Sequence, residues 1–202
     1  MTEKEFFYTI EKTAVAEFKD KGSRFIAFAF PVAAKEDFKT CLATVKVAHP
    51  KATHYCFAYR IGLDGNNFRS GDDGEPAGTA GKPILGQLDS KALTNTLIIV
   101  VRYFGGTLLG IPGLIAAYKT AASLVLQVTP AVQKQVELQY RLQFDYTIMN
   151  DLMTIIKQYN CTILKQDLQL FCSMEIGIAI NRAEQVLNRL ADTRNVEVQK
   201  IG

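Results

Sequence analysis

The sequence predicts an α+β fold in two domains that join near residues 130–134. Short apolar and aromatic runs of strand length alternate with segments in which apolar residues recur at helical spacing. A Thr-Pro pair at 129–130 interrupts this pattern, and the segment that follows has the order β-α-β-β-α-β. That order is typical of the ferredoxin-like split unit. We therefore expect an N-terminal domain over 1–130 and a ferredoxin-like C-terminal domain over 135–202.

The N-terminal domain is expected to contain four strands, because four runs are rich in β-branched and aromatic residues. These runs are 14–19, 24–32, 53–61 and 94–104. The last run is apolar throughout, which indicates a strand that is covered on both faces.

Three helices accompany these strands. Phe38, Leu42 and Val45 recur at helical spacing and predict a helix over 34–48. Pro83 suits the first turn of a helix over about 83–92, because the missing N–H of proline has no partner to lose there. Pro112 opens the third helix, which is largely apolar and is expected to face the core.

The C-terminal domain begins with an alternating apolar and polar run at 136–147, which predicts a half-buried strand. Asn150 is expected to cap a helix that ends near 159, and Asn181 is expected to cap a second helix. The remaining strands are expected as a hairpin and a closing strand, at 161–168, 170–180 and 195–201.

Composition excludes several classes of protein. The four cysteines form no C-x-x-C pair, so neither a zinc site nor a disulfide framework is predicted. The chain lacks a basic start followed by an apolar run, and no stretch reaches the ~18 apolar residues of a membrane span. We expect a cytoplasmic protein that does not bind membranes. The net charge of +3 belongs to residues 1–130, which hold 15 Lys and Arg against 12 Asp and Glu.

The candidate site lies in two loops between residues 70 and 110. Eight of the 14 glycines fall between Gly71 and Gly110. Glycine concentrates where the backbone takes positive φ or approaches another group closely. The first loop is SGDDGEPAGTAGKP, and the second begins with the GG of VRYFGGTLLG.

Three motifs carry a resemblance to a known family: HYCFAYRIG at 54–62, SGDDGEPAGTAGKPIL at 70–85 and LIIVVRYFGGTLLGIPGL at 97–114. In this order and spacing they resemble the YigZ/IMPACT family, and the trailing segment resembles the C-terminal domain of its bacterial members. The resemblance covers essentially the whole chain. It implies a first domain like domain 2 of ribosomal protein S five and a ferredoxin-like second domain. It also implies contact with RNA or the translation apparatus, because the eukaryotic IMPACT role is regulation of translation.

Phosphate binding is the first chemistry that the loops suggest. Gly105 and Gly106 join a buried strand to a helix, and helix N-termini with free N–H groups bind phosphate. Cations that could hold a phosphate backbone are Arg24, Arg60, Lys82 and Arg102. The structural alternative is that the glycines only permit a tight turn and that Arg102 pairs with Asp72, Asp73 or Glu75.

The loops match no cofactor motif. Gly81-Lys82 is followed by Pro83, where a P-loop has Ser or Thr, and the dinucleotide fingerprint is absent. We therefore expect no cofactor and no resident metal. The carboxylates Asp72, Asp73 and Glu75 leave open a metal-assisted or acid-base role, although acidic loop residues most often cap backbone amides.

His54 and Tyr103 complete the set of candidate site residues. A lone histidine such as His54 is more often a hydrogen-bonded structural residue than a general base. Cys56 and His54 do not predict a nucleophilic pair, so nucleophilic catalysis is disfavoured. Cations also lie in segments rich in stackable rings, a pattern that suits single-stranded or irregular RNA. The cations are Lys21, Arg24, Arg60, Arg69, Lys82 and Arg102, and the rings are Phe25, Tyr55, Tyr59, Tyr103 and Phe104. Alternatively, these rings fill the core.

Three functions follow from these residues. The first is a non-enzymatic protein that binds RNA or a ribosome-associated component. The second is a small enzyme, a metal-assisted or phosphate-handling hydrolase that uses Asp72, Asp73 and Glu75. The third is a regulator of translation or stress that acts through a protein partner. The sequence does not distinguish the ligand, the partner or the oligomeric state.

Overall fold

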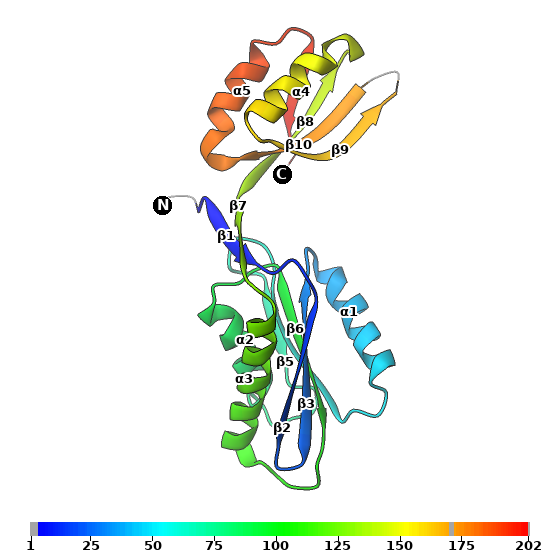
Figure 1. Ribbon diagram of the computed structural model, residues 1–202, viewed down its shortest axis with the longest axis vertical. Helices are drawn as coiled ribbons and strands as arrows, with labels where there is room; N and C mark the ends of the chain where they lie inside the picture. Colours follow the sequence, from blue (N-terminus) through cyan, green and yellow to red (C-terminus); the bar gives the residue numbers. More distant parts are fainter. Residues whose placement is uncertain (1–3, 170–171, 202) are drawn as a thin grey trace. The chain divides into compact units, whose positions relative to one another are not determined.

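The computed structural model describes residues 4–169 and 172–201 (Figure 1). The chain divides into two compact units. The larger unit is Phe7–Lys134, and the smaller unit is Gln135–Gly202 together with the start of the chain up to Phe6. Each unit has its own sheet and its own buried core.

The larger unit is built on a five-stranded antiparallel sheet with the order β2-β3-β6-β4-β5. Its strands are β2 Ala14–Asp20, β3 Ser23–Pro31, β4 His54–Arg60, β5 Phe68–Gly71 and β6 Thr96–Tyr103. The continuous apolar run of β6 places it at the centre, where seven of its eight residues are buried. The expected cover on both faces of this strand is confirmed.

Helices cover both faces of that sheet (Figure 1). α1 (Lys35–Ala48) packs through Val45 and Phe38 against one face. α2 (Gly81–Ser90) and α3 (Gly110–Val128) pack against the other. Among the described residues α3 alone is long and apolar enough to cross a membrane, and it lies in the core of this unit, where Tyr118 is fully buried.

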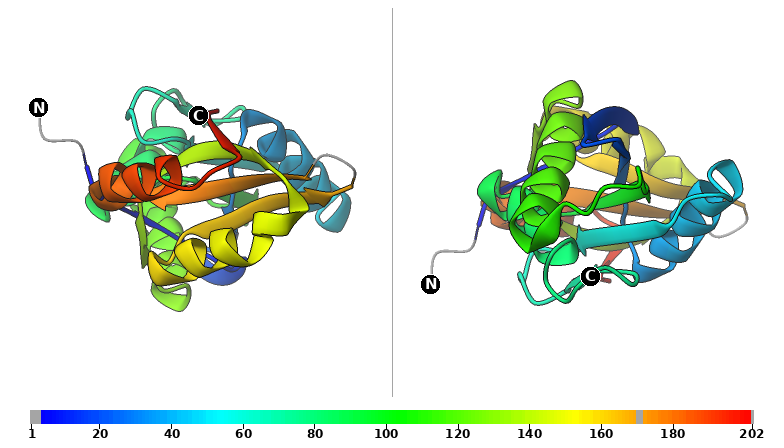
Figure 2. Two further views of the ribbon diagram at one scale, coloured as in Figure 1. Left: turned by 90° about the horizontal axis from the view of Figure 1, so that it is seen from above. Right: turned by 90° about the horizontal axis from the view of Figure 1, so that it is seen from below.

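The smaller unit has the order β-α-β-β-α-β that the sequence predicts. Its elements are β8 Glu137–Phe144, α4 Met149–Gln158, β9 Thr162–Leu168, β10 Cys172–Ala179, α5 Ala183–Ala191 and β11 Val196–Lys200. The antiparallel sheet has the order β11-β8-β10-β9. α4 and α5 lie on one face, over a core that includes Leu142, Met174 and Ile176 (Figure 2). The first two residues of the run at 170–180 lie outside the described residues.

Both predicted helix caps in this unit are wrong. Asn150 lies inside α4, whose cap position is Ile148, and Asn181 precedes the cap of α5, which is Arg182. Each helix is entered through a 3-10 turn, Tyr146–Ile148 for α4 and Ile180–Arg182 for α5. In both cases the 3-10 turn therefore begins before the asparagine that was expected to be the N-cap.

Three short strands have no counterpart in the sequence predictions. β5 pairs with β4 at the edge of the large sheet. β1 (Phe6–Thr9) and β7 (Val132–Gln135) form a separate two-stranded sheet. Each has only four residues, too few to show a clear periodicity.

Candidate functional site

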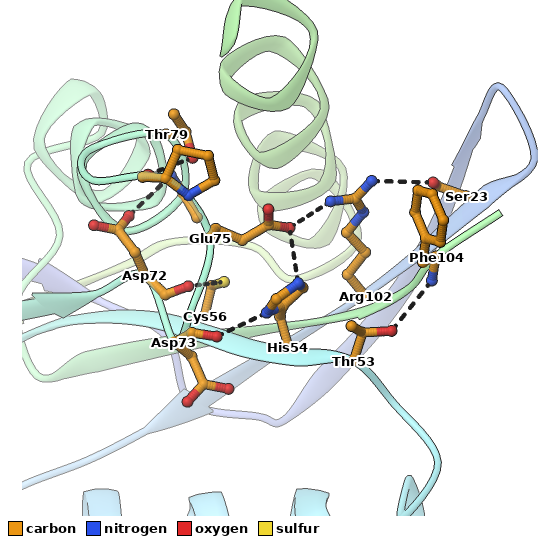
Figure 3. Close-up of polar contacts among 12 residues, drawn as sticks. Ser23, Thr53, His54, Cys56, Asp72, Asp73, Glu75, Thr79, Arg102 and Phe104 are labelled. Atoms are coloured by element: carbon orange, nitrogen blue, oxygen red, sulfur yellow. Dashed lines mark hydrogen bonds and ion pairs between the residues drawn. The ribbon is translucent and has the colours of Figure 1, made fainter. Parts of the chain in front are cut away.

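The two glycine loops meet at one end of the large sheet. His54 begins β4 and lies opposite Arg102, near the end of β6. The first loop leads from β5 to α2 and the second leads from β6 to α3, so both loops leave the sheet at this end. Figure 3 shows side chains from both loops and from β4 and β6 directed toward one another.

Two of the glycines are required by close backbone contacts. A Cβ on Gly105 would lie 1.9 Å from the carbonyl carbon of Gly22, and one on Gly81 would lie 2.8 Å from the amide nitrogen of Gly71. Gly106 differs, because it has a φ of +85° and open space where a side chain would begin. The packing explanation therefore accounts for Gly105 and Gly81, and the turn geometry accounts for Gly106.

A buried ion pair lies at the centre of the site. Nη1 of Arg102 is 2.6 Å from Oε1 of Glu75, and both side chains are almost completely buried. The hydroxyl of Tyr118 donates to the same oxygen at 2.7 Å. The structure thus realises the alternative in which Arg102 pairs with an acidic residue of the first loop, and that residue is Glu75.

The remaining donors of Arg102 are only partly used. Nη2 donates to Oγ of Ser23 at 3.3 Å, and the same hydroxyl accepts the amide N–H of Gly105 at 3.2 Å. Nε is buried and finds no acceptor among the described residues. Arg102 therefore connects the first loop, through Glu75, to the β2–β3 turn and the second loop, through Ser23.

Asp72 caps a helix from outside it. Its Oδ1 accepts the amides of Ala80 and Gly81 at 3.0 and 2.8 Å, and its Oδ2 accepts the amide of Gly78 at 2.8 Å. Burial alone would raise the pKa of Asp72, but these N–H groups and the nearby Lys82 outweigh it and lower that pKa. Asp72 thus satisfies the N-terminus of α2, which has no cap of its own.

Asp73 and His54 join the first loop to β4. Oδ2 of Asp73 accepts the amide of Tyr55 at 2.7 Å, and the carbonyl of Asp73 lies 2.7 Å from Nδ1 of His54. A carbonyl only accepts, so Nδ1 of His54 carries the proton in this contact. Nε2 then points toward Glu75, with Oε1 at 3.8 Å. His54 is therefore hydrogen-bonded to the first loop through Nδ1, with Nε2 facing the buried carboxylate.

The three carboxylates of the first loop do not converge. Asp72, Asp73 and Glu75 have separate partners, and Figure 3 shows the Asp73 side chain directed away from Glu75. Within residues 4–169 and 172–201 no three His, Cys, Asp or Glu side chains gather as a metal site would require. The arrangement is that of loop-fixing groups.

Cys56 and Tyr118 are protonated interior groups. The thiol of Cys56 lies 3.0 Å from the carbonyl oxygen of Asp72 and 3.3 Å from the hydroxyl of Tyr118. Burial raises the pKa of Cys56 and of Tyr118 far above their ordinary values. A thiol that stays protonated and is fully buried is a poor nucleophile.

The four candidate phosphate-binding cations do not form one patch. Arg102 is buried, whereas Arg24 lies opposite Tyr103 and pairs with Glu17 at 2.6 Å. Arg60 is six residues from His54 along β4, about 20 Å away at the rise of a strand, and pairs with Asp89. Lys82 is exposed in the first turn of α2. Lys82, beside the first loop, and Arg24, opposite Tyr103 before the second loop, are the two exposed cations of this set that lie next to a glycine loop.

The second loop is the more exposed of the two loops. Residues 104–108 are all exposed, including Phe104 at 47% and Leu108 at 84%. Lys21 is exposed beside Gly22, the residue that touches Gly105. The 19-residue helix α3 follows this loop, and no side chain in the described part of the chain caps its N-terminus at Leu109. The two loops thus differ, because Asp72 satisfies the helix after the first loop.

Residues 21–126 match the family described as Impact N-terminal domain. An IMPACT family member of Haemophilus influenzae is 34% identical over 188 residues, which are 92% of this chain and 91% of that protein. The chain belongs to the IMPACT family.

A second family member and a solved structure also cover most of the chain. IMPACT family member YigZ of Escherichia coli is 34% identical over 182 residues, 89% of this chain and 88% of its own length. A crystal structure described as that of a hypothetical protein is 30% identical, with a TM-score of 0.76 and 98% of each chain covered. Residues 21–126 contain the whole contact network, from Ser23 to Tyr118.

Sequence reasoning missed three contributors to this IMPACT site. Ser23, Thr53 and Tyr118 hold the second loop or the buried carboxylate through hydrogen bonds. The sequence contains one indication of the role of Tyr118. A tyrosine inside a largely apolar helix is expected to be buried, and a buried hydroxyl needs a hydrogen-bond partner. Ser23 and Thr53 gave none, because their partners are 82 and 51 residues away in the sequence.

Proposed function

We propose that this IMPACT family member is a non-enzymatic cytoplasmic protein that binds RNA or a ribosome-associated component. The binding surface is the exposed stretch 104–108 of the second loop, with the N-terminus of α3. The observation that carries the proposal is that α3 has no side-chain cap, whereas α2 is capped by Asp72. The free N–H groups and the positive end of the helix dipole suit a phosphate.

The expected phosphate contacts take different roles in this proposal. Gly106 presents backbone to the ligand, Gly105 sets the turn through its amide contact with Ser23, and Lys82 supplies charge from the rim. Arg24 contributes from the neighbouring face, where its guanidinium is 6.0 Å from the centre of the Tyr103 ring. Arg60 would contact a longer RNA at the other end of the sheet. Arg102 holds the two loops together through Glu75 and Ser23 rather than meeting the ligand.

A regulator that acts through a protein partner is the second candidate. Phe104, Leu108 and Ile111 are exposed apolar side chains in and just after the second loop. Apolar side chains of this kind are typical of protein interfaces. A role in translation accords with the resemblance to IMPACT. The hydrolase alternative has weaker support, because all three carboxylates are engaged with the protein itself.

The finer fold assignments belong to the same proposal. The order β8-α4-β9-β10-α5-β11 supports a ferredoxin-like smaller unit. The likeness of the larger unit to domain 2 of ribosomal protein S five rests on the family resemblance.

Fluorescence anisotropy with a labelled single-stranded RNA tests the proposal at about 50 mM and about 200 mM salt, because each phosphate contact adds to the salt dependence. Thr107→Glu places a carboxylate before α3, and Lys21→Glu reverses a charge beside Gly22. We expect each variant to weaken binding about 3- to 10-fold and to flatten the salt dependence.

Lys39→Glu is the matched control, because Lys39 is exposed on α1, across the sheet from the loop helices. It has the same charge change as Lys21→Glu and should bind as the unaltered protein does. Equal losses in Lys21→Glu and Lys39→Glu would mean that net charge alone sets the affinity for RNA. Binding that ignores both salt and Thr107→Glu would contradict the RNA proposal and favour the protein partner.

A further inference from the structure

We propose that the protein self-associates through β9, the edge strand of the smaller unit, with β9 of a second copy as its partner. β9 has one neighbouring strand among the described residues, β10, and its other edge carries backbone groups without a strand partner. All seven residues of β9 are exposed. Such an edge is a template for an added strand.

The sequence of β9 is complementary to itself in the antiparallel sense. A two-fold axis through Gln166 places Lys165 opposite Asp167 of the second copy, and Asp167 opposite Lys165. The same register places Leu164 opposite Leu168 twice. Residues directly opposite one another share a face of the sheet, so each pair meets its complement.

The existing sheet supports this register on its open face. Arg141 of β8, Glu175 of β10 and Lys165 of β9 are successive neighbours across the sheet. Arg141 and Glu175 already form an ion pair at 2.8 Å. Asp167 of the second copy would extend this row of alternating charges by one strand. A lysine on an edge strand ordinarily discourages pairing with other chains, but in this register it gains a carboxylate.

The exposed apolar side chains of β9 also favour a second copy of this chain as the partner. Leu164 and Leu168 are 45% and 44% exposed, and Ile163 is 38% exposed. The register shifts against β10 beside Leu164, so the pairing with a second copy extends only over residues 164–168. The interface is therefore short, which predicts a weak dimer at the low end of interface sizes.

Sedimentation velocity of the nuclease-treated full chain, from about 5 µM to about 500 µM, tests this proposal across the range of a weak interface. We expect a species of twice the 22.4 kDa chain mass to appear with rising concentration. Lys165→Asp and Asp167→Lys, each alone, place like charges opposite one another twice and should weaken dimerisation on the order of 10-fold or more. The double variant K165D/D167K restores both opposite-charge pairs and should restore the dimer.

Lys157→Asp is the control, since Lys157 is exposed on α4 of the same unit and the charge change is identical. It should dimerise normally, and far-UV circular dichroism checks that every variant is folded. A monomer at all concentrations overturns the proposal. A dimer that both single variants leave intact, or that the double variant fails to restore, overturns it as well. None of these results depends on RNA binding.

Discussion

Arg102→Met is the sharpest test of the structural argument, because it removes one partner of a buried ion pair and keeps the apolar stem. Glu75 would lose its 2.6 Å contact in a side chain that is 3% exposed. Removing one partner of a buried pair costs about 3–5 kcal/mol. Tyr118 still donates to Glu75, and the substitution also removes the unsatisfied Nε of Arg102. Both effects place the expected loss at the lower end, about 3 kcal/mol.

Amide hydrogen exchange read peptide by peptide measures this loss, because it follows the larger unit separately from the smaller one. Protection in β6 should fall about 100-fold or more, whereas protection in β8 and β10 should not change. Arg60→Met is the control, because its pair with Asp89 is partly exposed and should contribute no more than about 1 kcal/mol. A loss below about 1 kcal/mol for Arg102→Met would refute the claim that this pair holds the loops.

Two further predictions concern the loops. Gly105→Ala should destabilise the larger unit by about 3 kcal/mol or more, since its Cβ would overlap the Gly22 backbone. Gly86→Ala, where the new Cβ meets nothing within 4 Å, should stabilise it by about 0.5–1 kcal/mol; thermal melts of both variants measure the contrast, and equal effects would contradict it. Asp72→Asn should cost about 1 kcal/mol at neutral pH through a weaker cap. Because folding lowers the pKa of Asp72, its contribution is present above its unfolded value of about 4 and is lost as pH falls through the folded value. Urea titrations at several pH values should therefore show the two proteins converging in acid, and a constant gap would argue against the cap.

Local patterns were enough for most elements of the fold. The apolar run of β6 predicted a buried central strand, and Phe38, Leu42 and Val45 predicted α1, because periodicity reports which side chains face a core. The caps at Asn150 and Asn181 failed because the 3-10 turns before α4 and α5 depend on how each helix joins its sheet. A cap pattern contains no information about that join.

The candidate site, like the fold, was predicted only in part from the sequence. The sequence predicted where it lies and offered a pairing of Arg102 with an acidic loop residue, but it did not choose among Asp72, Asp73 and Glu75. In the tertiary structure Arg102 pairs with Glu75, because that carboxylate also faces Tyr118 of α3 and His54 of β4.

By itself the sequence determined the α+β class, the central strands and the concentration of glycine in two loops, since composition and periodicity act over a few neighbouring residues. Only the tertiary structure decided that Arg102 is buried against Glu75 and that the second loop is the more exposed of the two. The physical reason is that burial and ion pairing depend on residues distant in sequence, such as the 79 positions that separate Ser23 from Arg102.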